Sequence, residues 1–241
     1  MAHLGGRARS QYVARMFGRI ARRYDLLNAV MSAGRHHAWR RQAVDLAVGD
    51  LRGPALDVAA GTGDFAFELL RRRPVSRVLA LDYAPEMLAR ARHKAHRHRV
   101  SERLTLIRGD AHDLPFADGQ FVAATVGFGI RNFVDLPRAF REMARVVQPG
   151  GRVATLEIVK IEGDRRWAAA FARYFGHVTP WLGALLAGDR EAYTYLPESV
   201  TGFLEAGQIA TMMQEAGLHN VLYRTLAMGT VAIHVGEKAL D

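Results

Sequence analysis

Short apolar runs alternate along the chain with longer segments in which apolar side chains recur every three or four positions. The longer segments predict helices at 64–72, from Pro85 onward and at 136–147. Strands that alternate with helices indicate a parallel sheet covered on both faces. The short runs predict buried strands at 55–59, 77–82, 104–108, 121–126 and 152–158.

The two ends of the chain extend this pattern. Before the first strand, Val13, Met16, Phe17, Ile20 and Tyr24 fall at helical spacing, and a second helix is expected at 39–48. After the fifth strand, which a turn at 149–151 is expected to introduce, the aromatic-rich segment 162–205 predicts an inserted helical cap. A helix at 206–216 and adjacent strands at 220–226 and 229–235 then predict a closing antiparallel hairpin. We therefore expect one α/β domain over 1–241, with an N-terminal helical segment at 1–48.

The loop after the first predicted strand carries the clearest chemical signal. Residues 55–64 read Ala-Leu-Asp-Val-Ala-Ala-Gly-Thr-Gly-Asp. Gly61 and Gly63 let a ligand lie against bare backbone, because glycine has no Cβ. Asp82 ends the second predicted strand about 20 residues later, where a nucleotide-binding βαβ unit places a carboxylate for ribose hydroxyls. A nucleoside-like cofactor is expected here.

The acids around this loop favour one cofactor. Asp57 and Asp64 flank the glycines, and carboxylates repel a pyrophosphate but suit a ligand with ammonium and sulfonium charges. S-adenosylmethionine is therefore preferred over NAD, and Asp110 is expected to accept from its adenine amino group. Taken singly, Asp57 fits a loop brace, Asp64 a first-turn acid and Asp82 a solvated strand end. The predicted cofactor-binding residues are Asp57, Gly61, Thr62, Gly63, Asp82, Tyr83, Asp110, Ala111 and Gly127, and no metal is expected.

Residues 50–160 resemble class I S-adenosylmethionine-dependent methyltransferases, with Ala59 where many members have the first glycine. Their Rossmann-like sheet is the fold we expect. From about 12 to 238 the chain resembles the quinone-biosynthesis C-methyltransferases, which methylate the ring of demethylmenaquinol and, in many bacteria, a polyprenyl methoxy-benzoquinol. The segments that carry this resemblance are 16–41, Gly-Phe-Gly-Ile-Arg-Asn at 127–132, Tyr-Thr-Tyr-Leu-Pro-Glu-Ser-Val at 193–200, and 228–234.

The chemistry implied by the resemblance assigns roles to three residues. A ring carbon is nucleophilic when the quinol is a phenolate, and a phenol has a pKa near 10. Arg131 is expected to stabilise the phenolate, directly or through a water that removes the proton. Asn132 is expected to orient a ring oxygen, and Tyr24, with Asn28, to close over the pocket. The alternatives are a surface ion pair between Arg131 and Asp135, and a core position for Tyr24.

Composition and charge limit which kinds of catalysis and which binding partners are possible. The chain has no cysteine, which excludes disulfides and thiolate catalysis. Of its net charge of +9, residues 1–44 carry most, with nine arginines against one acid, and residues 90–99 form a second basic cluster. Such charge fits nucleic acid, an anionic membrane or a solvated face. An RNA methyltransferase is disfavoured because no aromatic platform accompanies the charge.

A prenylated quinol resides in the membrane, so the arginines and the aromatic cap predict contact with an anionic membrane surface. No apolar run approaches the roughly 20 residues of a membrane span, and no signal peptide is evident. We expect a cytoplasmic enzyme at the inner face of the cell membrane, with no nucleic acid partner. Related enzymes often pair as homodimers, so a homodimer is one expected state. A methyltransferase of another phenolic or lipid acceptor remains the alternative.

Overall fold

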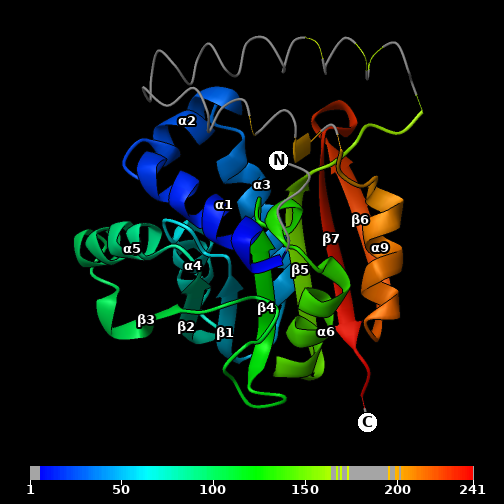
Figure 1. Cartoon of the computed structure of the whole chain (residues 1–241). Coiled ribbons are helices and arrows are strands. Elements are labelled where there is room, and N and C mark those ends of the chain that lie inside the picture. Colours follow the sequence, from blue (N-terminus) through cyan, green and yellow to red (C-terminus); the bar gives the residue numbers. More distant parts are fainter. Residues whose placement is uncertain are drawn as a thin grey trace.

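A computed structural model describes residues 6–163, 167, 169, 173, 195, 199, 200 and 202–240. Its strands form one seven-stranded sheet in the order β3-β2-β1-β4-β5-β7-β6 (Figure 1). The strands are β1 (Gly53–Val58), β2 (Val75–Asp82), β3 (Leu104–Arg108), β4 (Phe121–Gly127), β5 (Val147–Ile158), β6 (Leu218–Leu226) and β7 (Val231–Lys238).

The sheet has a parallel core and an antiparallel edge. Strand β1 pairs in parallel with β2 and β4, whereas β7 runs antiparallel to both β5 and β6. The predicted parallel sheet with a C-terminal hairpin is therefore confirmed. The order of the strands reverses between β1 and β4, and ligands of open α/β sheets bind beyond the carboxyl ends of the strands at such a point.

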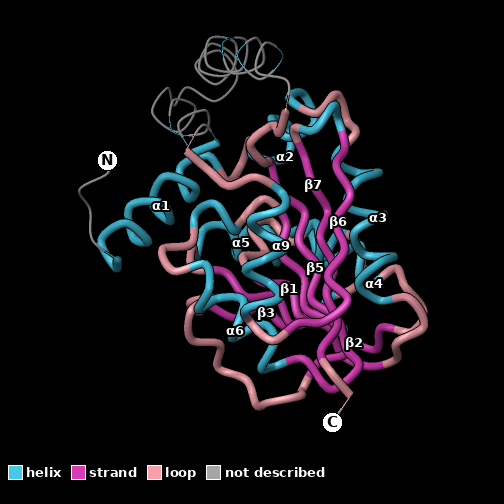
Figure 2. Tube along the Cα trace, turned by 90° about the vertical axis from the view of Figure 1, so that its right-hand side faces the viewer, coloured by secondary structure: helices cyan, strands magenta, loops and turns pink. Residues whose placement is uncertain are grey.

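Helices cover both faces of the sheet, with α3 and α4 on one side and α6 and α9 on the other (Figure 2). Apolar side chains of α3 and α4 pack with those of β1 and β2, and Phe140, Met143 and Ile209 fill the opposite core. The fully buried β1 and β4 explain why their sequences read as continuous apolar runs. The covering helices are α3 (His36–Val48), α4 (Asp64–Leu70), α5 (Pro85–Arg97), α6 (Leu136–Val146) and α9 (Ala206–Glu215).

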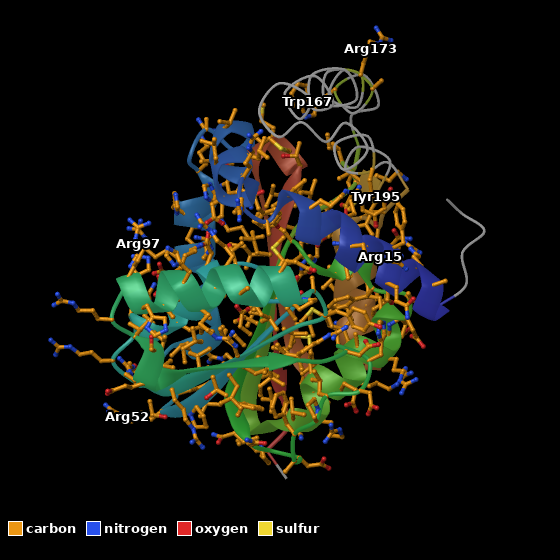
Figure 3. The ribbon with its side chains drawn as sticks, turned by 60° about the vertical axis from the view of Figure 1, so that its left-hand side comes forward. Arg15, Arg52, Arg97, Trp167, Arg173 and Tyr195 are labelled. Atoms are coloured by element: carbon orange, nitrogen blue, oxygen red, sulfur yellow. The ribbon has the colours of Figure 1, made fainter. Side chains whose placement is uncertain are left out.

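Two further helices, α1 (Gly6–Ile20) and α2 (Tyr24–Met31), precede the sheet. The predicted helical spacing is confirmed for Val13, Met16 and Ile20 of α1, which pack together with Leu27 of α2. Tyr24 was expected in the same helix, but it begins α2 after a break at residues 21–23. Tyr195 joins this cluster and lies beside α1 in Figure 3. Most of the expected cap at 162–205 lies outside the described residues.

The turn expected ahead of the fifth strand lies inside β5 instead. Val147 pairs with Phe121 and Arg152 with Ala123, so five residues of β5 span two of β4. Glycine is needed at two positions of this bulge. Gly150 has a left-handed φ of 70°, and Gly151 lies so close to Val147 that an added Cβ would be 2.5 Å from Val147 Cγ1. The bulge extends β5 and keeps its later residues in register with β4.

Candidate active site

The carboxyl group of Asp82 is held at the end of β2 by backbone donors. Gly61 N–H donates to its Oδ2 (2.7 Å), and Ala84 N–H donates to its Oδ1 (2.8 Å). Burial raises the pKa of Asp82 above its ordinary value, and these hydrogen bonds oppose the rise. The glycine loop therefore fixes an acceptor group whose remaining lone pairs face the adjoining cavity.

That cavity, here called the cofactor cleft, has a volume of about 740 Å³, counting the space that opens to solvent. It runs along the ends of the parallel strands beneath α1 and brings together six of the predicted cofactor residues: Gly61, Asp82, Tyr83, Asp110, Ala111 and Gly127. The residues present fit a nucleoside cofactor, because fixed carboxylates lie where bare backbone lets a ligand approach.

Two local features shape the cleft. Asp110 Oδ1 accepts from the backbone N–H of His112 (3.0 Å) and contacts its ring Nδ1 (2.5 Å). Because His112 Nε2 accepts from Asp135 N–H (3.1 Å), the ring proton is on Nδ1, and Asp110 retains Oδ2 for a ligand. On the opposite wall, a Cβ on Gly127 would overlap the Phe65 ring, so only glycine fits.

Three predicted cofactor residues lie behind the loop and do not line the cleft. Asp57 is fully buried and accepts from Thr125 Oγ1 (3.0 Å), and burial raises its pKa to about 8. Gly63 has φ 86° and precedes α4. Thr62 is buried and directs its hydroxyl to Asp25 of α2. These three residues stabilise the conformation of the glycine loop and do not line the cleft.

Thr62 belongs to a partly buried charged group, here called the clamp cluster: Asp25, Arg40, Thr62, Asp64 and Lys94. Lys94 Nζ donates to Asp25 Oδ2 (2.8 Å), to Thr62 Oγ1 (3.2 Å) and to Asp64. Arg40 donates to Asp64 Oδ2 (2.9 Å). Although burial raises the pKa of Asp64, Arg40 and Lys94 lower it below its ordinary value. The cluster joins α2, α3 and α5 to the glycine loop, and sequence reasoning missed Arg40 and Lys94.

A second cavity, here called the acceptor pocket, is lined in part by α2 and has a volume of about 1560 Å³, again counting the space that opens to solvent. It shares Phe17, Tyr24 and Phe128 with the cofactor cleft. Aliphatic and aromatic side chains dominate its walls. Its polar lining residues are Tyr24, Asn28, Ser32, Arg35, His36, Arg131, Tyr195 and Thr230. The two cavities therefore meet at a wall made by three aromatic residues.

Arg131 lies in the wall of the acceptor pocket and is buried. It forms an ion pair with the fully buried Glu157 and donates to Phe128 O (2.8 Å). The surface pair with Asp135 is wrong, because Asp135 instead caps α6 by accepting from Arg138 N–H (2.9 Å). Burial raises the pKa of Glu157, and Arg131 partly offsets that rise. Glu157 is a site residue that the sequence did not reveal.

The other two predicted catalytic residues flank the shared wall. Tyr24 contacts both cavities and packs edge-on against Phe17, with ring centroids 5.9 Å apart. Burial raises the pKa of Tyr24, so its hydroxyl stays protonated. Asn132 lines the cofactor cleft, and its Oδ1 accepts from Tyr195 OH (3.0 Å). The sequence left open whether Tyr24 is a core residue or a site residue. In the structure it packs against Phe17 and also lines both cavities.

The histidine of β7, His234, belongs to the core. Its ring is buried and contacts Thr155 Oγ1 (3.2 Å) and Ala206 O (2.9 Å), so both ring nitrogens have polar partners. Within the described part of the chain, no group of three or more histidines, aspartates or glutamates is arranged to hold a metal ion.

The model of the ubiE/COQ5 methyltransferase family matches residues 6–238. The chain belongs to this family. The Deinococcus radiodurans demethylmenaquinone methyltransferase is 44% identical over 95% of this chain and 94% of its own length. The Thermus thermophilus enzyme of that name is 44% identical over 92% of this chain and 100% of its own length. The Paracoccus denitrificans ubiquinone/menaquinone biosynthesis C-methyltransferase UbiE is 41% identical, over 92% and 89%.

Solved structures agree on the fold. A SAM-dependent methyltransferase from Thermotoga maritima superposes with a TM-score of 0.65 at 17% identity, over 94% of this chain and 99% of its own. The [4+2]-cyclase SpnF superposes with a TM-score of 0.66 at 20% identity, over 85% and 82%. Family membership confirms the predicted methyltransferase and its methyl donor, S-adenosylmethionine. The likeness to a cyclase shows that the fold alone does not determine the reaction.

Proposed function

We propose that this family member transfers a methyl group from S-adenosylmethionine to a ring carbon of demethylmenaquinol. The observation that carries the proposal is the pair of cavities that meet at Phe17, Tyr24 and Phe128. One has the carboxylates and backbone of a nucleoside site, and the other is large, apolar and lined by a buried arginine. The names of the Deinococcus and Thermus relatives support this acceptor. The Paracoccus relative supports a polyprenyl benzoquinol as a second acceptor.

The cofactor cleft offers a distinct group for each part of the donor. Asp82 accepts hydrogen bonds from ribose hydroxyls, and the free Oδ2 of Asp110 accepts from the adenine amino group. Because Gly127 has no Cβ, the donor can lie close to the backbone there, beside the aromatic wall that the two cavities share. The bound donor supplies a methyl group on a cationic sulfur. Holding the acceptor carbon in line with that methyl group contributes much of the rate, because a bimolecular step becomes effectively unimolecular.

Arg131 provides the electrostatic part of the reaction. The Glu157 carboxylate and the Phe128 carbonyl oxygen hold its guanidinium in one orientation. A preoriented donor in an apolar pocket stabilises the oxyanion that forms as the quinol ionises. Because Asn132 lines the cofactor cleft, we assign it to positioning Tyr195 and the donor side of the wall, and not to the ring oxygen.

The helix α2 excludes water from the reacting atoms. Tyr24 separates the cavities, and the neighbouring Asp25 is tied to Thr62 and Lys94 in the clamp cluster. This contact fixes α2 over the glycine loop, so that the donor and acceptor sides share one rigid wall. Closed sites of this kind protect the reacting groups from solvent.

The enzyme would reach its prenylated substrate at an anionic membrane surface. Large apolar side chains are exposed on α2, namely Leu26 (54%) and Val30 (43%), and in the lining of the acceptor pocket, namely Met228 (74%). Arg22 and Arg35 are exposed beside them. Each arginine near such a surface contributes about 1 kcal/mol of attraction. No helix in the described part of the chain is long and apolar enough to cross a membrane.

Two experiments test this proposal. The gene should restore menaquinone in a bacterial strain that lacks its own demethylmenaquinone methyltransferase, and accumulation of the demethyl form would reject the acceptor. The purified protein should sediment with anionic liposomes at low salt and less at high salt. Equal sedimentation with neutral liposomes would reject the electrostatic part of membrane binding.

A further inference from the structure

A row of polar side chains runs along the wall of the acceptor pocket at a spacing of four residues. Its members are Tyr24, Asn28, Ser32 and His36, and all four line the pocket. Tyr24 and Asn28 lie four residues apart on α2, where such residues are neighbours, and Ser32 directly follows the end of that helix. His36 begins α3 after a turn in which Ala33 (φ 48°) and Gly34 (φ 73°) are left-handed. The row therefore presents a sequence of hydrogen-bonding groups to any ring that occupies the pocket.

The hydrogen bonds at the end of this row fix the tautomer of His36. Ser32 Oγ lies 2.6 Å from the Asn28 carbonyl oxygen, and two oxygens at that distance require a proton between them. The single hydroxyl proton of Ser32 is therefore used. His36 Nδ1 lies 2.7 Å from the same Oγ, so Nδ1 carries the proton and donates it.

This tautomer leaves the other ring nitrogen, Nε2, with a lone pair and no proton. No described residue forms a hydrogen bond with Nε2, while the ring, only 2% exposed, lines the pocket. Burial lowers the pKa of His36 to about 4, and the neighbouring His37 and Arg40 add to that effect. At neutral pH the ring stays uncharged, and toward the pocket it accepts hydrogen bonds and donates none.

We propose that His36 determines which oxidation state of the ring the acceptor pocket binds. This inference rests on the proposed function. A hydroquinol carries hydroxyl groups that donate to Nε2, whereas a quinone presents only carbonyl lone pairs, which Nε2 repels. Only the hydroquinol has the ring electron density that methylation needs. His36 therefore admits the reactive form and rejects the oxidised form before any chemistry occurs.

The expected discrimination is large. A site built to bond a substrate hydroxyl loses that bond with an analogue that lacks the proton, and it also leaves its own acceptor buried and unpaired. We expect the hydroquinol to bind at least about fivefold more tightly than the quinone, which corresponds to the lower end of the cost of one such unpaired group. The repulsion between two acceptors adds to this ratio.

The test compares the binding of a naphthoquinol with a short prenyl tail and of its quinone, by anaerobic calorimetry with S-adenosylhomocysteine present. In H36Q the side-chain amide offers a donor as well as an acceptor, so the quinol-to-quinone affinity ratio should fall to within about threefold of unity. S32A removes the partner that fixes the tautomer and should lower the ratio in part. H219Q, an exposed histidine on β6, is the matched control and should keep the original ratio.

The outcomes separate this inference from the proposed function. If the unchanged protein methylates the quinol but H36Q keeps the same affinity ratio, His36 does not select the oxidation state and the inference is rejected. If the unchanged protein binds S-adenosylhomocysteine but neither ring form, the proposed function is rejected along with it. Retained affinity of H36Q for S-adenosylhomocysteine shows that the variant is folded, because His36 lies outside the cofactor cleft.

Discussion

Replacing Arg131 with methionine tests the buried ion pair between Arg131, in the wall of the acceptor pocket, and Glu157. Glu157 is fully buried. Without the Arg131 guanidinium, its carboxylate keeps only two backbone donors, the N–H of Ile158 (2.9 Å) and the N–H of residue 131 itself (3.4 Å). Removing one partner of a buried pair costs about 3–5 kcal/mol, because a buried charge is left uncompensated. For a protein of this size each kcal/mol corresponds to about 2–4 °C in Tm, so R131M should melt about 6–20 °C lower.

The pH dependence of this loss follows from the pKa of Glu157. Burial already raises that pKa, and removing the guanidinium raises it further. A carboxyl that binds its proton more tightly in the folded state than in the unfolded state stabilises the fold as the pH decreases. The deficit of R131M should therefore be smaller at pH 5 than at pH 8. The double variant R131M/E157Q should recover a large part of the loss at pH 8.

The measurement is urea unfolding at both pH values, with R152M as the matched control. Arg152 of β5 pairs with Glu237 of β7, and both side chains are about one-third exposed (31% and 35%), so this ion pair contributes about 0–1 kcal/mol. A loss below about 1 kcal/mol in R131M at pH 8, no larger than that of R152M, would refute the reasoning. Methyl transfer by R131M should fall about 10²–10³-fold if the guanidinium stabilises the oxyanion.

Three further predictions concern the cofactor side. D82N should weaken the binding of S-adenosylhomocysteine about 10- to 100-fold in calorimetry, because a carboxylate bonds hydroxyls more strongly than an amide; unchanged affinity would remove Asp82 from the site. Asp57, with its pKa raised to about 8, holds a proton in the folded state that the unfolded state releases, so the unfolding free energy should fall as the pH rises from about 4 to 8. D57N should flatten that slope, and an equal slope in both proteins would show that Asp57 is ionised when folded. G127A should lower the unfolding free energy more than G61A, because a Cβ on Gly127 overlaps the Phe65 ring, whereas a Cβ on Gly61 meets no protein atom within 4 Å and costs the fold only the strain of φ 56°. Equal losses of unfolding free energy in the two variants would contradict the crowding between Gly127 and Phe65.

The sequence was sufficient for features whose causes are local. Buried parallel strands appear as apolar runs, and the turn from β1 into α4 requires the glycines that the sequence shows. The position of Asp82 follows from the spacing of one βαβ unit. The same locality explains the error at Pro149, since a proline and two glycines predict a turn wherever they occur, and only pairing with β4 makes them a bulge.

The contacts that shape the active site are tertiary and left no local signal. Glu157 lies 26 residues from Arg131, and Lys94 lies 69 residues from Asp25. Asp57 was expected to face the ligand, yet β1 is buried on both faces, so its sequence has no alternation to show which side each residue takes. Docking of helices on the sheet decides these neighbours.

Methyl transfer by the purified protein tests the central claim most directly. With S-adenosylmethionine labelled in its methyl group and demethylmenaquinol kept reduced, we predict one labelled methyl group on a ring carbon of the product and none when the quinone replaces the quinol. The absence of labelled menaquinol from a protein that still binds S-adenosylhomocysteine would contradict the proposed function.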